Sequence, residues 1–235
     1  MQRWADAERV LVELAELELA GRELAEGSET VTPCLMAFAG EQLRFTAFLR
    51  EFDKGAYHSP MIELLALATP LDADRLAFAI SGRAWSLRDP IAPVTDDVDL
   101  RQRVLCIELV DGTRGRPQRT SVLLPFDLLP LLPGASAEPG PPGTLGPLQR
   151  PVWGERQALP GGEGWIGSAL ALAVSTRARR RMRAPDAEIA RQARRVGLLG
   201  HELYLEEALA ERLVRAAPFP GARAGFHGEV QDGRP

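Results

Sequence analysis

Residues 34–50 read CLMAFAGEQLRFTAFLR, and this run predicts a β-hairpin. Its first half, residues 34–39, is apolar at every position, which is typical of a strand buried on both faces. Gly40 and Glu41 then supply the turn. The second half alternates, with Leu43, Phe45, Ala47 and Leu49 on one face and Arg44, Thr46 and Arg50 on the other. A period of two indicates a strand with one face in the core.

A helix is predicted on each side of the hairpin. Residues 3–26 carry an apolar stripe at spacings of four and three residues, formed by Val10, Leu14, Leu17, Gly21 and Leu24. Residues 59–69 are nearly all apolar and should form a short buried helix. Ser59 is the expected N-cap, Pro60 suits the first turn, and Pro70 ends the helix.

Three further strands follow in the sequence, at residues 75–87, 103–110 and 120–124. Gly82 is interpreted as a bulge in the first of them. The second is apolar on both faces apart from Glu108, a pattern that suits a central strand.

The resulting order, α-β-β-α-β-β-β, predicts an α+β fold with a mainly antiparallel five-stranded sheet and flanking helices, because most connections are short. We expect residues 1–130 to form this sheet domain. The order resembles that of the profilin and roadblock type of small α+β domain. That resemblance is one of topology, and it implies no particular function.

The rest of the chain changes in composition. Residues 131–164 are dense in proline and glycine, which predicts a linker. Residues 165–216 are predicted to be helical, with a new helix beginning at Pro185, and to pack on the first domain. A later apolar stripe is expected from Leu198, Leu205, Leu209 and Leu213. We expect residues 217–235 to form a disordered tail.

The overall charge argues against two classes of partner. The 235 residues have a net charge of −4, which suggests no bulk attraction to nucleic acid or to an anionic membrane. Lys54 is the only lysine, and we attribute the arginine excess to a GC-rich genome. Cys34 and Cys106 lie in apolar runs and should be reduced core thiols. With no signal peptide and no apolar run of about 20 residues, we expect a cytoplasmic protein without a membrane span.

No catalytic, cofactor or metal motif stands out. Residues 162–167, GEGWIG, match the glycine pattern of dinucleotide-binding loops, but a proline-rich segment precedes them and Glu163 would repel a phosphate. Two zinc patterns and the nucleophile elbow of hydrolases are absent. We therefore predict no catalytic residues, no cofactor and no metal.

Residues 82–90 combine a tryptophan with charged side chains at the end of a predicted strand. Tryptophan and arginine are enriched at binding hot spots, so Arg83, Trp85 and Arg88 are predicted to contact a partner. In the alternative interpretation, Trp85 fills the edge of the core and Arg88 pairs with Asp89.

A second candidate surface is an arginine-rich helical region. Its predicted partner-binding residues are Arg177, Arg179, Arg180, Arg181 and Arg183. The first interpretation is a solvated face, or one that pairs with the acidic N-terminal helix. A protein partner is the second and nucleic acid is the third.

Together these patterns favour a non-enzymatic protein-interaction or regulatory protein that binds a protein partner or a second copy of itself. One alternative is a nucleic-acid-binding protein that uses the arginine-rich helix. The other is a small hydrolase or transferase in which Glu63, Glu108 or Asp72 forms a carboxylate site.

Overall fold

A computed structural model of the chain describes residues 3–23, 30–53, 55–84, 102–114, 116–126, 157–160, 165–180, 185–216 and 223–224. The strands are β1 (Cys34–Ala39), β2 (Gln42–Phe48), β3 (Arg75–Ala84), β4 (Gln102–Asp111), β5 (Gln118–Pro125), β6 (Gln157–Pro160), β7 (Glu202–Leu205) and β8 (Arg223–Ala224). The helices are η1 (Trp4–Asp6), α1 (Ala7–Glu23), α2 (His58–Ala68), α3 (Trp165–Arg180), α4 (Asp186–Leu198) and α5 (Glu207–Ala216).

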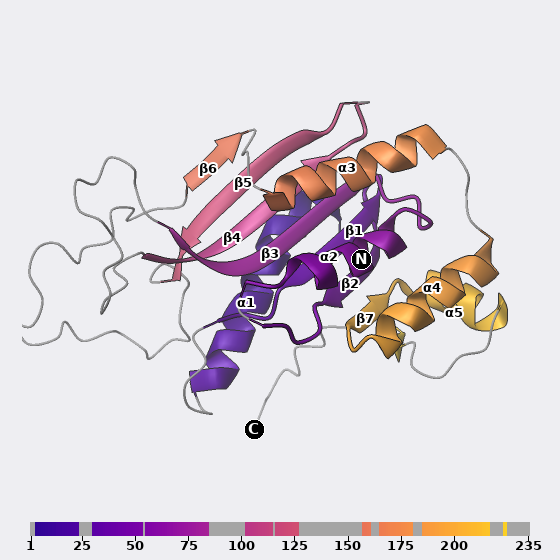
Figure 1. Cartoon of the computed structure of the whole chain (residues 1–235), viewed down its shortest axis with the longest axis horizontal. Coiled ribbons are helices and arrows are strands. Elements are labelled where there is room, and N and C mark those ends of the chain that lie inside the picture. The colour runs from indigo at the N-terminus through magenta and orange to yellow at the C-terminus, as the bar shows by residue number, and fades with distance from the viewer. Residues whose placement is uncertain are drawn as a thin grey trace, which may run out of the picture.

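The strands form one sheet, with eight of them in the described part of the chain, in the order β6-β5-β4-β3-β1-β2-β7-β8 (Figure 1). Every neighbouring pair is antiparallel except β7 and β8. The predicted α+β class and mainly antiparallel sheet are therefore confirmed. The five predicted strands are present, and β6, β7 and β8 extend the sheet beyond them.

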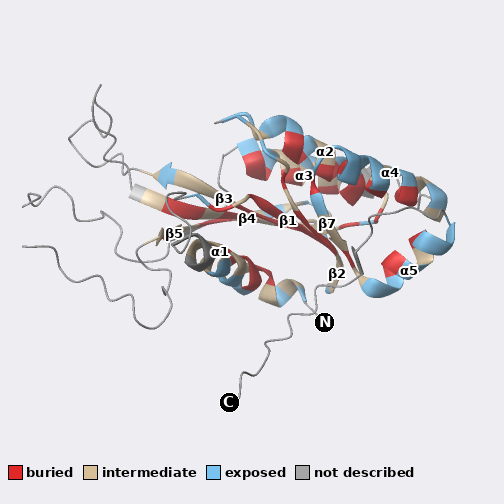
Figure 2. Ribbon diagram, turned by 90° about the horizontal axis from the view of Figure 1, so that it is seen from below, coloured by how far each residue is buried: buried red, intermediate tan, exposed pale blue. Residues whose placement is uncertain are grey.

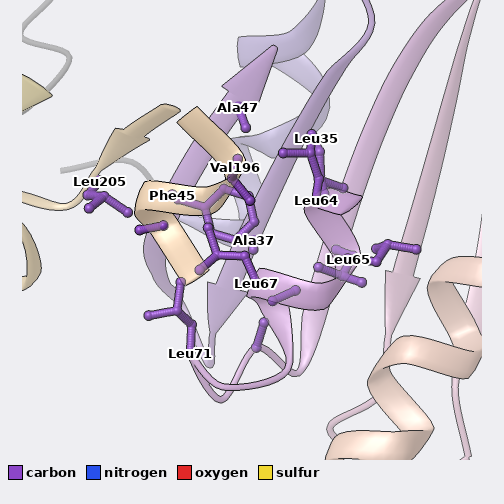
Figure 3. Packing of buried hydrophobic residues seen from close by; sticks show 14 of the residues in the cluster. Leu35, Ala37, Phe45, Ala47, Leu64, Leu65, Leu67, Leu71, Val196 and Leu205 are labelled. Carbon is purple, nitrogen blue, oxygen red and sulfur yellow. The ribbon is translucent and has the colours of Figure 1, made fainter. Parts of the chain in front are cut away.

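The molecule has three layers, with α1 on one face of the sheet and α2, α3 and α4 on the other (Figure 2). This arrangement explains why β1 is apolar at successive positions. Leu35 and Ala37 belong to the core beneath α2, α3 and α4, whereas Met36 and Phe38 belong to the core against α1. Figure 3 shows how the first of these cores joins distant segments, with Val196 of α4 beside Phe45 of β2.

One residue of β2 faces the opposite core from the one predicted. The register shifts between Ala37 and Phe38, so that Ala37 lies opposite Phe45 but Phe38 lies opposite Leu43. Arg44 is thus an extra residue in β2, and the alternation changes face there. As a result, Leu43 packs against the α1 core, while Phe45 packs against the other one.

Two smaller predictions were wrong. The predicted bulge at Gly82 does not form, because β3 and β4 stay in continuous register from Arg75 to Ala84. Ser59 is not the N-cap of α2. The helix begins at His58, so Tyr57 is the N-cap, and its side chain makes no capping hydrogen bond. The Ser59 hydroxyl instead donates to Glu63 within the helix, at 3.4 Å.

The C-terminal region departs from the predicted run of helix. Gly200, with a φ of 97°, follows α4 and turns the chain back so that β7 pairs with β2. Leu205 therefore enters the core from a strand, and Leu209 and Leu213 enter it from α5. Leu198 does not join them and is exposed at the end of α4.

The predicted linker and tail lie mostly outside the described residues. Four residues of the linker form β6, which pairs with β5 at one edge of the sheet. Two residues of the tail form β8, which lies parallel to β7 at the opposite edge.

Candidate functional site

Of the predicted tryptophan–arginine surface, only Arg83 lies among the described residues. Arg83 lies near the end of β3, is exposed and stands opposite Arg103 of β4 in register. Trp85 and Arg88 lie outside the described residues, so their predicted role stays a prediction.

The arginine-rich region is likewise described only in part. Arg177, Arg179 and Arg180 occupy the last turn of α3, whereas Arg181 and Arg183 lie outside the described residues. The helices α3 and α4 lie on the opposite face of the sheet from the acidic helix α1 (Figure 2). Arg191 of α4 pairs with Glu188 of the same helix, whereas Asp186 of α4 pairs with Arg212 of α5.

Glu63 of α2 is the centre of a polar cluster that joins three distant segments. Its carboxylate accepts two hydrogen bonds from the Arg50 guanidinium, at 3.0 and 3.1 Å. It also lies 2.8 Å from Nε2 of His201. The hydrogen bond from Arg50 lowers the pKa of Glu63 to about 2, against the opposing effect of burial. Glu63 is therefore a carboxylate at neutral pH.

The neutral ring of His201 is held in one tautomer by its two hydrogen bonds. Nδ1 accepts the backbone N–H of Arg50 at 3.1 Å, so the proton of the neutral ring is on Nε2 and points to Glu63. The side chain is fully buried. In this structure both ring nitrogens of His201 are engaged, one by the Arg50 amide and one by Glu63. The cluster thus links the segments that carry Arg50, Glu63 and His201.

Glu108 occupies a second polar cluster, beneath α3. It is 4% exposed, and its Oε1 accepts a hydrogen bond of 2.7 Å from the Ser121 hydroxyl on the neighbouring strand. Its Oε2 is buried without a hydrogen bond. Burial raises the pKa of Glu108, while the Ser121 hydrogen bond and the charge of Arg119 oppose that rise.

The Glu108 cluster leaves no room for a ligand on its helical side. A Cβ placed on Gly167 of α3 would stand 2.9 Å from Oε2 of Glu108 and 2.5 Å from Nη2 of Arg119. The guanidinium of Arg119 also donates to the Ser168 hydroxyl at 3.3 Å. Glu108 and Arg119 therefore form a polar contact beneath the first turn of α3.

The three carboxylates proposed for a hydrolase or transferase site do not share a site. Glu63 lies on α2, Glu108 lies in the middle of the sheet, and Asp72 lies in the turn after α2 with a φ of 61°. The described residues also hold no cluster of three or more side chains suited to a metal ion. Among the helices in the described ranges, none is long and apolar enough to cross a membrane.

An exposed apolar surface lies across α2 and α3, and sequence reasoning missed it. Ile62 is 55% exposed, Trp165 is 41% exposed and Leu172 is 67% exposed. His58 joins the two helices, because its ring meets Trp165 edge-on at 4.0 Å and stacks on Tyr57 at 4.5 Å. We call Ile62, Trp165, Leu172 and His58 the α2–α3 surface.

The signal for this surface was present in the sequence but ambiguous. Trp165 and Leu172 are seven residues apart and so share one side of a helix. The same helix also places Ile166, Leu170 and Val174 in the core. The sequence does not show which of the two apolar stripes faces the core and which faces solvent. The packing of the helix on the sheet decides this.

The chain was compared with protein-family models, with curated proteins and with solved structures, and none of them matches it. The resemblance in element order to profilin and roadblock domains thus has no matching solved structure behind it.

Proposed function

We propose that this chain is a non-enzymatic protein-interaction protein and that its partner binds the α2–α3 surface. The observation that carries this proposal is the exposure of Ile62, Trp165 and Leu172 on two helices in contact. Exposed large apolar side chains that lie together favour a binding role, whereas isolated ones do not. Trp165 adds the residue type most enriched at binding hot spots.

The geometry also supports a surface that is ready to bind. Trp165 is braced by His58 at 4.0 Å and by Tyr57 at 6.1 Å, both edge-on. Beneath it, Ile166 and Leu170 anchor α3 in the core. A braced aromatic side chain loses little conformational entropy when a partner covers it, which favours affinity.

The proposal is tested by photo-crosslinking in extract of the native host. A photoreactive amino acid is placed at Leu172 in one variant and at Leu17 in another. Leu17 is the matched control, because it is a leucine of similar exposure (66%) on α1, on the opposite face of the sheet. We expect a discrete crosslinked product from position 172 that disappears when Trp165→Ser is added.

Equal labelling from both positions, or a product that survives Trp165→Ser, would overturn the proposal. Far-ultraviolet circular dichroism of Trp165→Ser must match the parent, since the side chain is at the surface. Ile62→Ser provides a second variant on α2, and it should weaken the same product.

Nucleic acid remains the second proposed partner, for one reason. Arg194 and Arg195 are exposed on α4, one turn from Arg191. A titration against duplex and single-stranded DNA at two salt concentrations distinguishes this role. Phosphate contacts predict binding that weakens steeply with salt, and a lack of binding at low salt removes the alternative.

A further inference from the structure

The C-terminal unit, residues 185–216, docks on the sheet through a strand and an apolar face. β7 pairs with β2 over four residue pairs, from Phe45 with Leu205 to Phe48 with Glu202. Buried side chains of α4 and α5 complete the same core: Ile189, Ala190, Ala193, Val196, Leu209, Ala210 and Leu213. The unit therefore covers apolar surface of β2 and α2 that would otherwise face solvent.

His201 stands at the junction between α4 and β7, where the unit meets the rest of the chain. Its backbone N–H donates to the Val196 carbonyl at 3.4 Å, which fixes it to the end of α4. Its ring contacts two other segments. Nδ1 accepts a hydrogen bond from the backbone N–H of Arg50, and Nε2 lies 2.8 Å from the Glu63 carboxylate. The side chain is fully buried.

The hydrogen bond at Nδ1 requires the neutral ring, whereas the contact between Nε2 and the Glu63 carboxylate is kept when the ring is charged. A proton added at Nδ1 would point at the Arg50 N–H, which is itself a donor, so that hydrogen bond would break. The charge that faces the ring from the β2 side is the Arg50 guanidinium, which repels a second proton. The charge that faces it from α2 is Glu63, which attracts one. On α4, the nearest turn carries Arg195, which is exposed.

Together, these effects favour the neutral form of the His201 ring. Burial lowers the pKa of His201 from its ordinary value of 6.5, and the charge of Arg50 adds to this, although Glu63 and a hydrogen bond with the Phe48 backbone oppose the shift. The folded chain thus binds this proton less tightly than the unfolded chain does. The docked state keeps its full stability above pH 6.5 and loses stability as the pH falls below that value.

We propose that His201 is an acid-sensitive latch: a proton taken from solvent at Nδ1 breaks the bond to the Arg50 amide and weakens the docking of the C-terminal unit. Release uncovers the side of Phe45 and Leu49 that the unit packs against. The latch acts on the unit and not on the whole sheet, because β3, β4 and β5 make no pairing with it. This inference does not depend on the proposed partner surface.

The test is amide hydrogen exchange of the full chain at pH 7.5 and pH 5.5, corrected for the intrinsic effect of pH on exchange. Each unit by which a buried histidine's pKa is depressed corresponds to about a tenfold change in the opening equilibrium. We expect protection of residues 199–216 to fall several-fold at pH 5.5, while protection of β3 and β4 is unchanged. Unchanged protection of the unit, or an equal fall everywhere, would overturn the latch.

His201→Asn is the matched variant, because its side-chain oxygen can still accept the Arg50 amide but does not titrate. We expect its protection to be the same at both pH values, and a fall like that of the wild type would contradict the proposal. If His201→Asn fails to fold, nitrogen-15 spectra of the wild-type protein are recorded as a function of pH instead. The latch is ruled out if the His201 ring titrates while the amide resonances of β7 do not move.

Discussion

Gly167 of α3 lies directly over Glu108 of β4. A Cβ at position 167 would come within 2.9 Å of the Glu108 Oε2 atom, a distance that real Cβ contacts do not show. The approach of α3 to the sheet therefore depends on the absence of a side chain at this one position, and that approach places Trp165 on the surface.

Gly167→Ala should destabilise the protein even though alanine is the better helix former. The added methyl group would displace the ends of the Glu108 and Arg119 side chains, and because Glu108 is buried we expect a net loss of about 1 kcal/mol after the gain in helix propensity. Urea unfolding followed by circular dichroism measures the change. Gly197→Ala is the control, because that α4 glycine has no atom within 4 Å of an added Cβ. It should raise the free energy of unfolding by about 0.5 kcal/mol, and a loss of stability there would show that the packing argument is wrong.

Glu63→Gln should lower the free energy of unfolding at pH 7 by about 1–2 kcal/mol, through loss of a charge-assisted contact with Arg50. The pKa of Glu63 is lowered to about 2, so its contribution is present above pH 4.5 and is lost as the pH falls towards 2. Chemical unfolding at pH 7, 4 and 2.5 should therefore show the variant and the wild type converging in acid.

Glu13→Gln provides the comparison for that series. Glu13 pairs with Arg9 on the outer side of α1, where both side chains are at least half exposed. An exposed ion pair of this type contributes little to stability, because solvent screens it. The interpretation of Glu63 fails if the two variants lose equal stability at pH 7.

Both cysteines should resist alkylation while the protein is folded. Burial raises the pKa of the Cys106 thiol to about 12, with a further contribution from Glu108, and burial raises the pKa of Cys34 as well. The thiolate is the reactive form, so iodoacetamide at pH 8 should label neither residue within minutes. Mass spectrometry across a urea series should show labelling that follows unfolding, with the partly exposed Cys106 labelled before Cys34. Rapid labelling of either thiol in buffer would show that it is not packed as described.

Removal of the chain after residue 184 should compromise the sheet domain. The truncated chain loses the strand that pairs with β2 and uncovers Phe45, Ala47 and Leu49. We expect a lower melting temperature and binding of a hydrophobic dye, measured beside the full chain. If residues 1–184 melt at the same temperature as the full chain, the C-terminal unit does not stabilise the sheet domain, and the prediction of a shared core is wrong.

The elements of the sheet domain could be predicted because their signals are local. The hairpin of residues 34–50 combines an apolar run, a glycine turn and an alternating run. The strands β3, β4 and β5, which follow it in the chain, carry similar local patterns of apolar residues. The error of face at Leu43 arose because the extra residue at Arg44 leaves no mark in the pattern. Leu17, predicted on the apolar stripe of the first helix, is also on the wrong side, because α1 buries Ala7, Leu11 and Ala15 and leaves Leu17 exposed.

The candidate sites could not be predicted to the same extent. Glu63 and Glu108 were singled out as carboxylates in apolar surroundings, but their partners were not identified. His201 is 138 residues from Glu63 and 151 from Arg50, and the sequence pattern had assigned it to a helix. A short strand such as β7 has too few residues for alternation to distinguish it from helix.

The amino-acid sequence by itself determined which segments of the sheet domain are helix or strand, where the first hairpin turns, and that no familiar catalytic motif is present. Those properties follow from the periods of backbone geometry, which repeat within a few residues. Tertiary structure alone decided that α1 and α4 lie on opposite faces, that Trp165 is exposed, and that His201 is sealed between Arg50 and Glu63. Such contacts depend on how whole apolar faces pack together, and that packing is settled between segments that no local period connects.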